Sequence, residues 1–336
     1  MRSMIEMFTL ALLTGGMAAC GTSGPNELSF EEEIGFRLLR QDYHVATTTG
    51  DYELLRSIWA NDAVLTTDAG ARIDGGDAIA EHLAGDSTFG NVLVLTSESR
   101  WTVTPRGDSA EYAFETILVD LGGNDPAKTL LSDSGAQTAT VRIVAHTNST
   151  GIAERAADGR WAFRELNIGH GPLSLRGLAQ EEPGDGDLAV GDELGFRRMR
   201  ERFHLATTSG DRDLLRSVWA DDAVFRGGPN EIFGGDAVTD FMAGGAAFGR
   251  VLVLTPEYSA RLAVNDGIAV YAFECITIDV GDGDPLSTPL CTAGGEQNPA
   301  VEIVRHTHTS GFAKRVADGK WVFQEFNGGL GPLPSE

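Results

Sequence analysis

Basic residues are scarce in this sequence. Its 336 residues include 26 lysines and arginines against 49 aspartates and glutamates, which gives a formal net charge of −23. A surface this acidic repels phosphate backbones and anionic lipid headgroups, so we expect no nucleic-acid partner and no direct docking on a membrane surface. The excess of acid also keeps a protein soluble, which is its ordinary role on a surface.

Cysteine is equally scarce, and the usual signatures of bound metals and nucleotides are missing. The three cysteines form no CxxC pair and no cluster with histidine, which excludes the common spacings of zinc ligands. No glycine-rich phosphate loop and no nucleophile elbow occurs in the sequence. We therefore predict no metal site and no cofactor.

Long hydrophobic runs are missing as well. The apolar run 8–17 is shorter than the roughly 20 residues that a membrane-spanning helix needs, and it fits the core of a secretion signal. Small residues directly before Cys20 resemble a bacterial lipobox, which implies that Cys20 is lipidated, and Gly21 after it implies the outer membrane. We expect a signal peptide over 1–20, a tether over 21–29 and a lipid anchor as the only membrane contact of a cell-envelope protein. The alternative is an ordinary secreted protein.

A long stretch of the sequence occurs twice. Residues 44–64 read HVATTTGDYELLRSIWANDAV, and residues 204–224, 160 positions further on, read HLATTSGDRDLLRSVWADDAV. Other motifs recur in the same order: GGDA at 75–78 and 234–237, YAFE at 112–115 and 271–274, and ADG-x-W at 157–161 and 317–321. A repeat this long indicates duplicated domains rather than a solenoid. The predicted organisation is a first domain over 30–172, an acidic Gly/Pro linker over 173–190 and a second domain over 191–336.

Apart from Cys20, both cysteines lie in the second half. Thr116 and Ser132 stand at the first-half positions that match Cys275 and Cys291. Two cysteines that are present together in one copy and absent together from the other are typical of a disulfide acquired as a unit. We predict a Cys275–Cys291 disulfide that closes a loop of about 15 residues and stabilises the fold by roughly 3 kcal/mol. The alternative is two unrelated thiols.

Each half is predicted to form helices first and strands afterwards. Apolar residues recur three or four positions apart in 31–47, which predicts an amphipathic helix, and Gly50 is expected to end it. The further predicted elements of the first half are a second helix capped by Asp51 that buries Leu54, Leu55, Ile58 and Trp59, a strand over 63–67, a third helix over 78–83, strands over 91–104, 111–120 and 138–156, and a hairpin turn at Asp158-Gly159 followed by a strand over 161–168. This order predicts an α+β fold.

The W-x-x-D-A-V step, the G-G-D-A third helix and the final D-G-x-W hairpin resemble the NTF2-like superfamily, and within it the SnoaL-like group. The resemblance covers nearly the whole of both halves. It implies two cone domains, each with three N-terminal helices packed in a strongly curved antiparallel sheet and a pocket at the mouth. Members include ketosteroid isomerases, polyketide cyclases, dehydratases and non-catalytic binding or association domains, so the fold leaves the function open.

Most of the catalytic residues that ketosteroid isomerases use are replaced in this sequence by residues of other types. Those enzymes use a first-helix tyrosine, an aspartate base and a protonated aspartic acid. By resemblance the tyrosine falls on Tyr43, which is replaced by Phe203 in the second half, the base falls on Thr67 beside Asp68, and the acid falls on Gly151. Without a base within reach there is no proton shuttle, so we do not expect this isomerase activity.

Polar residues shared by the two halves form the candidate site. The predicted ligand-binding residues are Tyr43, His44, Glu115, His146, Glu165, Asn167, His204, Glu274, His306, Glu325 and Asn327. Histidine and glutamate that face one cavity can exchange protons or hold a ligand, and Tyr43, His44, Glu115 and His146 are the catalytic candidates. The structural alternative is that these are buried, hydrogen-bonded groups. Strict alternation from Gly151 turns His146 to the convex face, away from the pocket.

Three functions remain open. The first is non-catalytic binding of a small apolar or carbohydrate-like ligand in a cone pocket. The second is a cyclase, isomerase or lyase that uses His44, Glu115 and His146 for acid–base chemistry. The third is an assembly module in which the two domains pair through their sheets as a fused pseudo-dimer. Glu115 and His146 in one closed cavity would favour the second function, and the same residues at the contact between the halves would favour the third.

Overall fold

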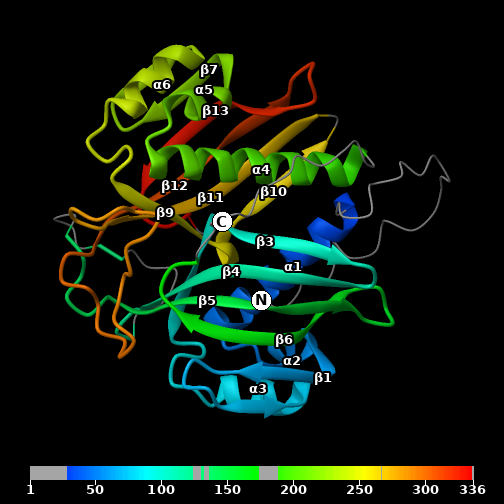
Figure 1. Cartoon of the computed structure of the whole chain (residues 1–336). Coiled ribbons are helices and arrows are strands. Elements are labelled where there is room, and N and C mark those ends of the chain that lie inside the picture. Colours follow the sequence, from blue (N-terminus) through cyan, green and yellow to red (C-terminus); the bar gives the residue numbers. More distant parts are fainter. Residues whose placement is uncertain (1–28, 124–129, 132–135, 174–187, 266, 335–336) are drawn as a thin grey trace.

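The computed structural model describes residues 29–123, 130–131, 136–173, 188–265 and 267–334. Its architecture is α+β, as predicted, and the two halves share one order of elements, except that the long strand β3 of the first half corresponds to β9, η1 and β10 in the second (Figure 1). The first half contains α1 (Phe30–Thr49), α2 (Tyr52–Ser57), β1 (Trp59–Thr66), β2 (Arg72–Asp74), α3 (Gly76–Ala84), β3 (Val92–Arg106), β4 (Ser109–Asp120), β5 (Arg142–Arg155) and β6 (Trp161–His170). The second half contains α4 (Leu188–Ser209), α5 (Arg212–Ser217), β7 (Trp219–Gly227), β8 (Asn230–Phe233), α6 (Gly235–Ala243), β9 (Val251–Pro256), the 3-10 turn η1 (Glu257–Ser259), β10 (Arg261–Asn265), β11 (Ile268–Asp279), β12 (Glu302–Arg315) and β13 (Trp321–Leu330).

Some predicted segments fall outside these residues. They include the predicted signal peptide with Cys20, all but the last residue of the tether, and residues 174–187 of the predicted linker. Helix α4 begins at Leu188, inside the segment expected to be linker. Among the helices of the described part, none is both long and apolar enough to cross a membrane.

Helix α1 is set by capping residues that the sequence displays. The Ser29 side chain accepts a hydrogen bond from the Glu32 N–H at 3.2 Å, and the Glu32 carboxylate accepts one from the Ser29 N–H at 2.8 Å. Gly50 ends the helix with a φ of 70°, in the left-handed region that favours glycine, as predicted.

The second helix is shorter than predicted. Asp51 caps α2 as expected, but the helix ends at Ser57 and Trp59 already begins β1. The reason lies in the partner strand, because the Phe163 N–H donates a hydrogen bond to the Ile58 carbonyl at 2.8 Å and draws the chain into the sheet. Ile58 and Trp59 are buried as predicted, at the helix end and in a strand rather than within the helix.

In the described part of the chain, one 13-stranded sheet runs through both halves, in the order β2-β1-β6-β5-β4-β3-β9-β11-β12-β13-β7-β8, with β10 paired to β11. Its neighbours are antiparallel except that β1 runs parallel to β6 and β7 runs parallel to β13. The prediction of a purely antiparallel sheet is wrong at these two pairs. The first and last strands of each half are separated by several elements, which is the long connection that a parallel pair requires.

The two halves meet at the middle of this sheet. Leu95 in β3 pairs with Pro256 in β9, and Thr96 pairs with Thr255. Helices α1 and α4 contact each other, while α2 and α3 lie at one end of the molecule and α5 and α6 at the other (Figure 1).

Among the described residues, buried hydrophobic side chains form three cores. Each half has an aromatic core between its helices and its strands, which includes Phe36, Trp59, Phe114 and Phe163 in the first half and Phe196, Trp219, Phe273 and Phe323 in the second. The third core is shared between the halves and is aliphatic; it includes Leu93, Leu95, Ile117, Val119, Leu252, Leu254, Ile276 and Ile278. Burial of this apolar area between the halves favours their association.

A glycine allows close strand approach in the long strand of each half. A Cβ on Gly151 would collide with the Glu165 carbonyl oxygen and come within 2.8 Å of the Tyr112 hydroxyl, and one on Gly311 would collide with the Glu325 carbonyl oxygen. Tyr112 donates a hydrogen bond to the same Glu165 carbonyl at 2.6 Å. This close approach explains why glycine occupies the position that resemblance assigns to a catalytic acid, because no carboxylate side chain fits there.

Candidate functional site

Tyr43 and His44 lie in the first-half core, between α1 and the sheet. The Tyr43 ring lies 6.0 Å from the Phe163 ring, and burial together with the Asp86 carboxylate raises the pKa of Tyr43 to about 12. Tyr43 therefore keeps its proton at neutral pH. His44 is 1% exposed, and its Nε2 lies 3.3 Å from the Thr116 hydroxyl.

Glu115 and His146 form a separate cluster with Arg100. Glu115 is 1% exposed and accepts hydrogen bonds from Arg100 Nε at 2.6 Å and from the Leu173 N–H at 2.7 Å. His146 Nε2 lies 3.2 Å from the other carboxylate oxygen. The Arg100 guanidinium also donates to the carbonyls of Leu173 and Leu286. The buried carboxylate thus has the cation and donors that a charge needs when it is removed from water.

The alternation of side chains along β4 keeps His44 apart from the Glu115–His146 cluster. Thr116 points to α1, where it meets His44, whereas Ile117 points to the aliphatic core shared by the halves. Glu115 lies on the same face of β4 as Ile117 because side chains alternate along a strand. His146 is the register partner of Ile117, which puts it on that face too. The structure brings Glu115 and His146 together and does not bring His44 to them.

A loop of the second half covers the Glu115–His146 cluster. The Leu290 N–H donates a hydrogen bond to His146 Nδ1 at 3.1 Å, and the Leu286 carbonyl accepts from Arg100. Because Nδ1 accepts, a neutral His146 carries its proton on Nε2, which faces Glu115. The cluster therefore lies at the contact between the halves.

Two glutamines beside this cluster each accept a hydrogen bond from the opposite half. Gln297 Oε1 accepts a hydrogen bond from the Ile143 N–H at 2.9 Å, and Gln137 Oε1 accepts one from the Ile303 N–H at 2.8 Å. Each glutamine thus bonds to the first part of a long strand in the opposite half. The reciprocal pattern is the kind that a two-fold axis produces in a homodimer.

Glu274 and His306 repeat the buried pair in the second half with fewer partners. Each is 2% exposed, and His306 Nε2 lies 2.7 Å from Glu274 Oε2. The Leu333 N–H donates to Glu274 Oε1 at 3.0 Å. Ser259 stands at the position that matches Arg100. Within the described part of the chain, His306 Nδ1 has no hydrogen-bond partner.

The remaining predicted residues, on β6 and β13, stay apart from these clusters. Glu165 is half-buried and Asn167 is exposed. In the second half Glu325 pairs with Arg226 at 2.9 Å, and Asn327 donates a hydrogen bond to Glu325 at 2.9 Å. These residues lie on β6 and β13 and do not complete an acid–base group.

The predicted disulfide is wrong, since Cys275 and Cys291 are both thiols. Cys275 lies in β11 within the second-half core, where its Sγ is 3.5 Å from His204 Nε2. Cys291 lies in the loop over the first half, where its backbone forms an isolated antiparallel β-bridge with Gln297. Burial raises the pKa of the Cys291 thiol, against a hydrogen bond to the backbone of His146 that lowers it. The chain between the two cysteines leads from one half to the other, which explains why they do not pair.

A buried charge network between α1 and α4 was missed from the sequence. Arg37 pairs with Glu33 at 2.8 Å and with Glu201 of α4 at 3.0 Å, and Arg198 of α4 also pairs with Glu33. The Arg37 guanidinium lies 4.2 Å above the Trp101 ring. Burial raises the pKa of Glu33, but the two arginines outweigh it and hold that pKa below its ordinary value. The available signal was a glutamate and an arginine four residues apart in the amphipathic helix.

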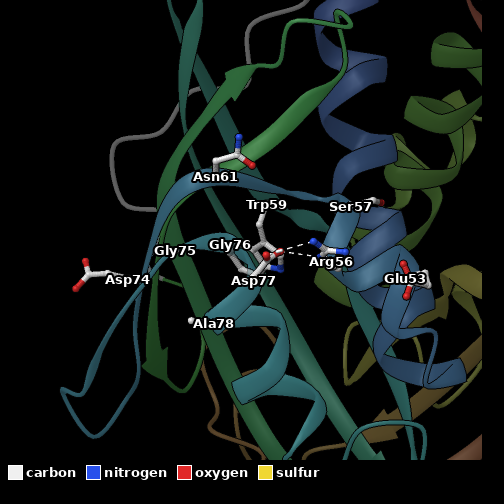
Figure 2. Close-up of a pocket in the computed structure, with 10 residues that line it drawn as sticks. All are labelled: Glu53, Arg56, Ser57, Trp59, Asn61, Asp74, Gly75, Gly76, Asp77 and Ala78. Carbon is white, nitrogen blue, oxygen red and sulfur yellow. Dashed lines mark hydrogen bonds and ion pairs between the residues drawn. The ribbon is translucent and has the colours of Figure 1, made fainter.

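A cavity of about 700 Å³ lies away from all of these residues, where α2, β1 and α3 meet (Figure 2). It is lined by Glu53, Arg56, Ser57, Trp59, Asn61, Asp74, Gly75, Gly76, Asp77 and Ala78. Arg56 Nε pairs with Asp77 Oδ1 at 2.6 Å, and both side chains are largely exposed. None of the predicted site residues lines it. Across the described ranges, no group of three or more His, Cys, Asp or Glu is placed to hold a metal ion.

Comparison with protein-family models and with curated proteins finds no match. Solved structures are similar to this chain. A protein of unknown function with a cystatin-like fold from Nostoc punctiforme matches over 44% of this chain and 96% of its own, at 13% identity and a TM-score of 0.34. An NTF2-like protein with a cystatin-like fold from Novosphingobium aromaticivorans matches over 48% and 86%, at 17% identity and a TM-score of 0.33. A protein of unknown function from Mycobacterium tuberculosis matches over 52% and 90%, at 17% identity and a TM-score of 0.34.

Proposed function

We propose that this chain is a non-catalytic assembly module whose two halves act as a fused pair. The observation that carries the proposal is the hydrogen bond from the Leu290 N–H to His146 Nδ1, beside the one from Arg100 to the Leu286 carbonyl. These bonds use the residues that are best suited to acid–base chemistry to join one half to the other. Glu115 and His146 are 1% and 2% exposed, so a substrate has no open path to them.

Three further contacts between the halves support the proposal. The sheet continues from β3 to β9, an aliphatic core is shared, and buried ion pairs join α1 to α4. A contact with a continuous sheet and a closed apolar core resembles an obligate subunit interface more than a transient one between mobile domains.

The acid–base alternative has less support from the geometry. His44 lies on α1 and contacts Thr116, on the opposite side of β4 from Glu115 and His146. A general base must lie within hydrogen-bond reach of the proton it moves, directly or through one water. The three residues therefore do not make one acid–base group.

The glutamine hydrogen bonds between the halves provide a test of whether the halves are paired. In the Gln297→Ala variant of the full chain, we expect the Ile143 amide to exchange its hydrogen about fivefold faster, because one net hydrogen bond across the halves is lost. Gln324→Ala is the matched control, since Gln324 Nε2 bonds to Asp222 within the second half. If Gln297→Ala leaves exchange at Ile143 unchanged, the Gln297 hydrogen bond between the halves does not form in solution and the proposal fails.

The cellular location of the protein is part of the proposal. A pair of cones tethered by a lipid on Cys20 would present its acidic surface at the cell envelope. Processing that is blocked by globomycin supports the lipid anchor, and maturation that is indifferent to the drug would leave a secreted protein instead.

The cavity in Figure 2 favours a second candidate function, the binding of a hydroxyl-rich, carbohydrate-like ligand. Glu53, Arg56, Asn61 and Asp77 line it, and they offer both donors and acceptors for hydroxyl groups. The test is a titration with mono- and oligosaccharides, followed by NMR, of the wild type and of Asn61→Ala. Shifts confined to the cavity residues and lost in Asn61→Ala would support binding, and no shift with any sugar would reject it.

A further inference from the structure

The second half contains a thiol–imidazole pair that the proposed function does not use. His204 on α4 lies between Thr255 of β9 and Cys275 of β11. Its Nδ1 is 3.4 Å from Thr255 Oγ1, and its Nε2 is 3.5 Å from Cys275 Sγ. A nucleophile next to a base that a third group orients is the general arrangement of an activated nucleophile.

We propose that Cys275 is a reactive thiol that His204 activates for attack on small hydroperoxides. The imidazole can take the thiol proton, which leaves a thiolate beside an imidazolium, and the thiolate is the nucleophilic form of cysteine. Thr255 restrains the ring from its other nitrogen, so that Nε2 stays directed at the sulfur.

The first half shows what the same position does without a thiol. There His44 Nε2 lies 3.3 Å from the hydroxyl of Thr116, the residue that matches Cys275. An imidazole cannot deprotonate a threonine hydroxyl to any useful extent at neutral pH, whereas a thiol ionises within about two pH units of imidazole. The replacement of Thr116 by Cys275 therefore changes a structural hydrogen bond into a pair that can transfer a proton.

The surroundings select a small electrophile. Cys275 is 8% exposed, His204 is 1% exposed, and the Phe273 ring stands 6.0 Å from the His204 ring. A protein, a peptide or a bulky thiol cannot reach a sulfur that is covered to this degree. A hydroperoxide is small, and its reaction needs only contact between one oxygen and the sulfur.

The reaction balances with these groups alone. The Cys275 thiolate attacks the outer oxygen of the hydroperoxide, an S–O bond forms and the O–O bond breaks. The leaving alkoxide or hydroxide takes the proton from the His204 imidazolium. The sulfur is oxidised to a sulfenic acid, and the peroxide is reduced to an alcohol or to water.

The structure also indicates that this sulfenic acid does not resolve to a disulfide with the other described cysteine. Cys291 lies in the loop over the first half, where its backbone pairs with that of Gln297. Cys275 lies in the second-half core. The expected product on the whole chain is therefore Cys275 carrying one added oxygen atom.

Cys291 provides an internal control for the test. It is 9% exposed against 8% for Cys275, so access is similar, but burial raises the pKa of the Cys291 thiol. In the folded full-length protein at pH 7, we expect iodoacetamide to alkylate Cys275 at least about tenfold faster than Cys291. Dilute hydrogen peroxide should add oxygen to Cys275 and leave Cys291 unchanged, as read by mass spectrometry of the peptides.

Two variants assign the effect. His204→Asn should slow both reactions at Cys275 to the rate at Cys291, and Cys275→Thr, which restores the first-half residue, should remove the fast site. If His204→Asn does not fold, the pH profile of the wild type decides: alkylation of Cys275 should stay nearly level from pH 8 down to pH 6. Alkylation at Cys275 that is no faster than at Cys291, or that falls with acid as for an ordinary thiol, overturns the proposal.

Discussion

The two halves carry the same buried histidine–glutamate pair in different surroundings. In the first half Glu115 is held by Arg100, and His146 accepts a hydrogen bond from the second-half loop. In the second half Glu274 contacts His306 and the Leu333 N–H, and Ser259 stands in place of the arginine. The pair therefore occurs in both halves, but within the described residues only the first half uses it to hold the other half. A residue shared by the two halves is not evidence of a shared function.

The largest effect is expected when the first half is changed to match the second, by removing the arginine that pairs with Glu115. Arg100→Ser leaves the Glu115 carboxylate buried without its cation, and we expect a loss of about 3–5 kcal/mol in the free energy of unfolding, measured in urea. The double variant Arg100→Ser, Glu115→Gln should recover much of this loss, since the buried charge is then removed. Arg164→Ser is the exposed control, with a change within about 0.5 kcal/mol. An Arg100→Ser protein as stable as the control would show that this arginine does not balance Glu115.

Removal of each histidine tests the same difference from the other side. His146→Ala leaves Glu115 with Arg100, whereas His306→Ala leaves Glu274 with a single backbone N–H as its described partner. The cavities created are alike, so the second variant should be less stable by about 1–2 kcal/mol. Thermal and urea unfolding of the two proteins side by side measure the difference. The opposite order would mean that the bond to the second-half loop matters more than the unpaired carboxylate.

The close-approach glycines should behave alike in the two halves. Gly151→Ala and Gly311→Ala each place a Cβ against a carbonyl oxygen of the neighbouring strand, and we expect each to cost about 2 kcal/mol. Gly294→Ala serves as the control, because its Cβ would meet only the Thr292 hydroxyl, at 3.7 Å. A cost at one glycine and not the other would show that the two strands differ in rigidity despite their common geometry.

The smallest expected effect concerns acid stability at the α1–α4 contact. The pKa of Glu33 in the folded protein lies below its ordinary value of 4.5, so its stabilising contribution is complete above pH 4.5 and is lost as the pH falls further. The wild type should therefore lose about 1 kcal/mol more than Glu33→Gln on acidification through this range. Glu193, the matching residue, is 40% exposed beside Arg197, so Glu193→Gln should follow the wild type. Parallel curves for all three proteins would remove Glu33 from the network.

Much of the local structure could be predicted from the sequence. The Gly50 helix end, the Asp51 cap and the turn at Gly159, with a φ of 85°, follow from residues within a few positions of each other. Alternation along β5 likewise places His146 on the face away from α1. The end of α2 at Ser57 could not be predicted, because a partner strand about a hundred residues further along the chain determines it.

The candidate site divides in the same way. The sequence identifies its residues, since Glu115, His146 and their second-half counterparts recur in matching motifs. It does not show that Arg100 joins them or that a loop of the other half covers them, because Leu290 and His146 are 144 positions apart. Nor does it show that Cys275 meets His204 rather than Cys291.

Capping, turn and alternation rules act between near neighbours, and for this protein they predict most of the helix ends and the strand faces. The partners of buried charges and thiols depend on which surfaces close together when the two halves pair. Those contacts arise from the packing of the whole sheet, whose order brings β3 beside β9, and from the second-half loop that reaches His146.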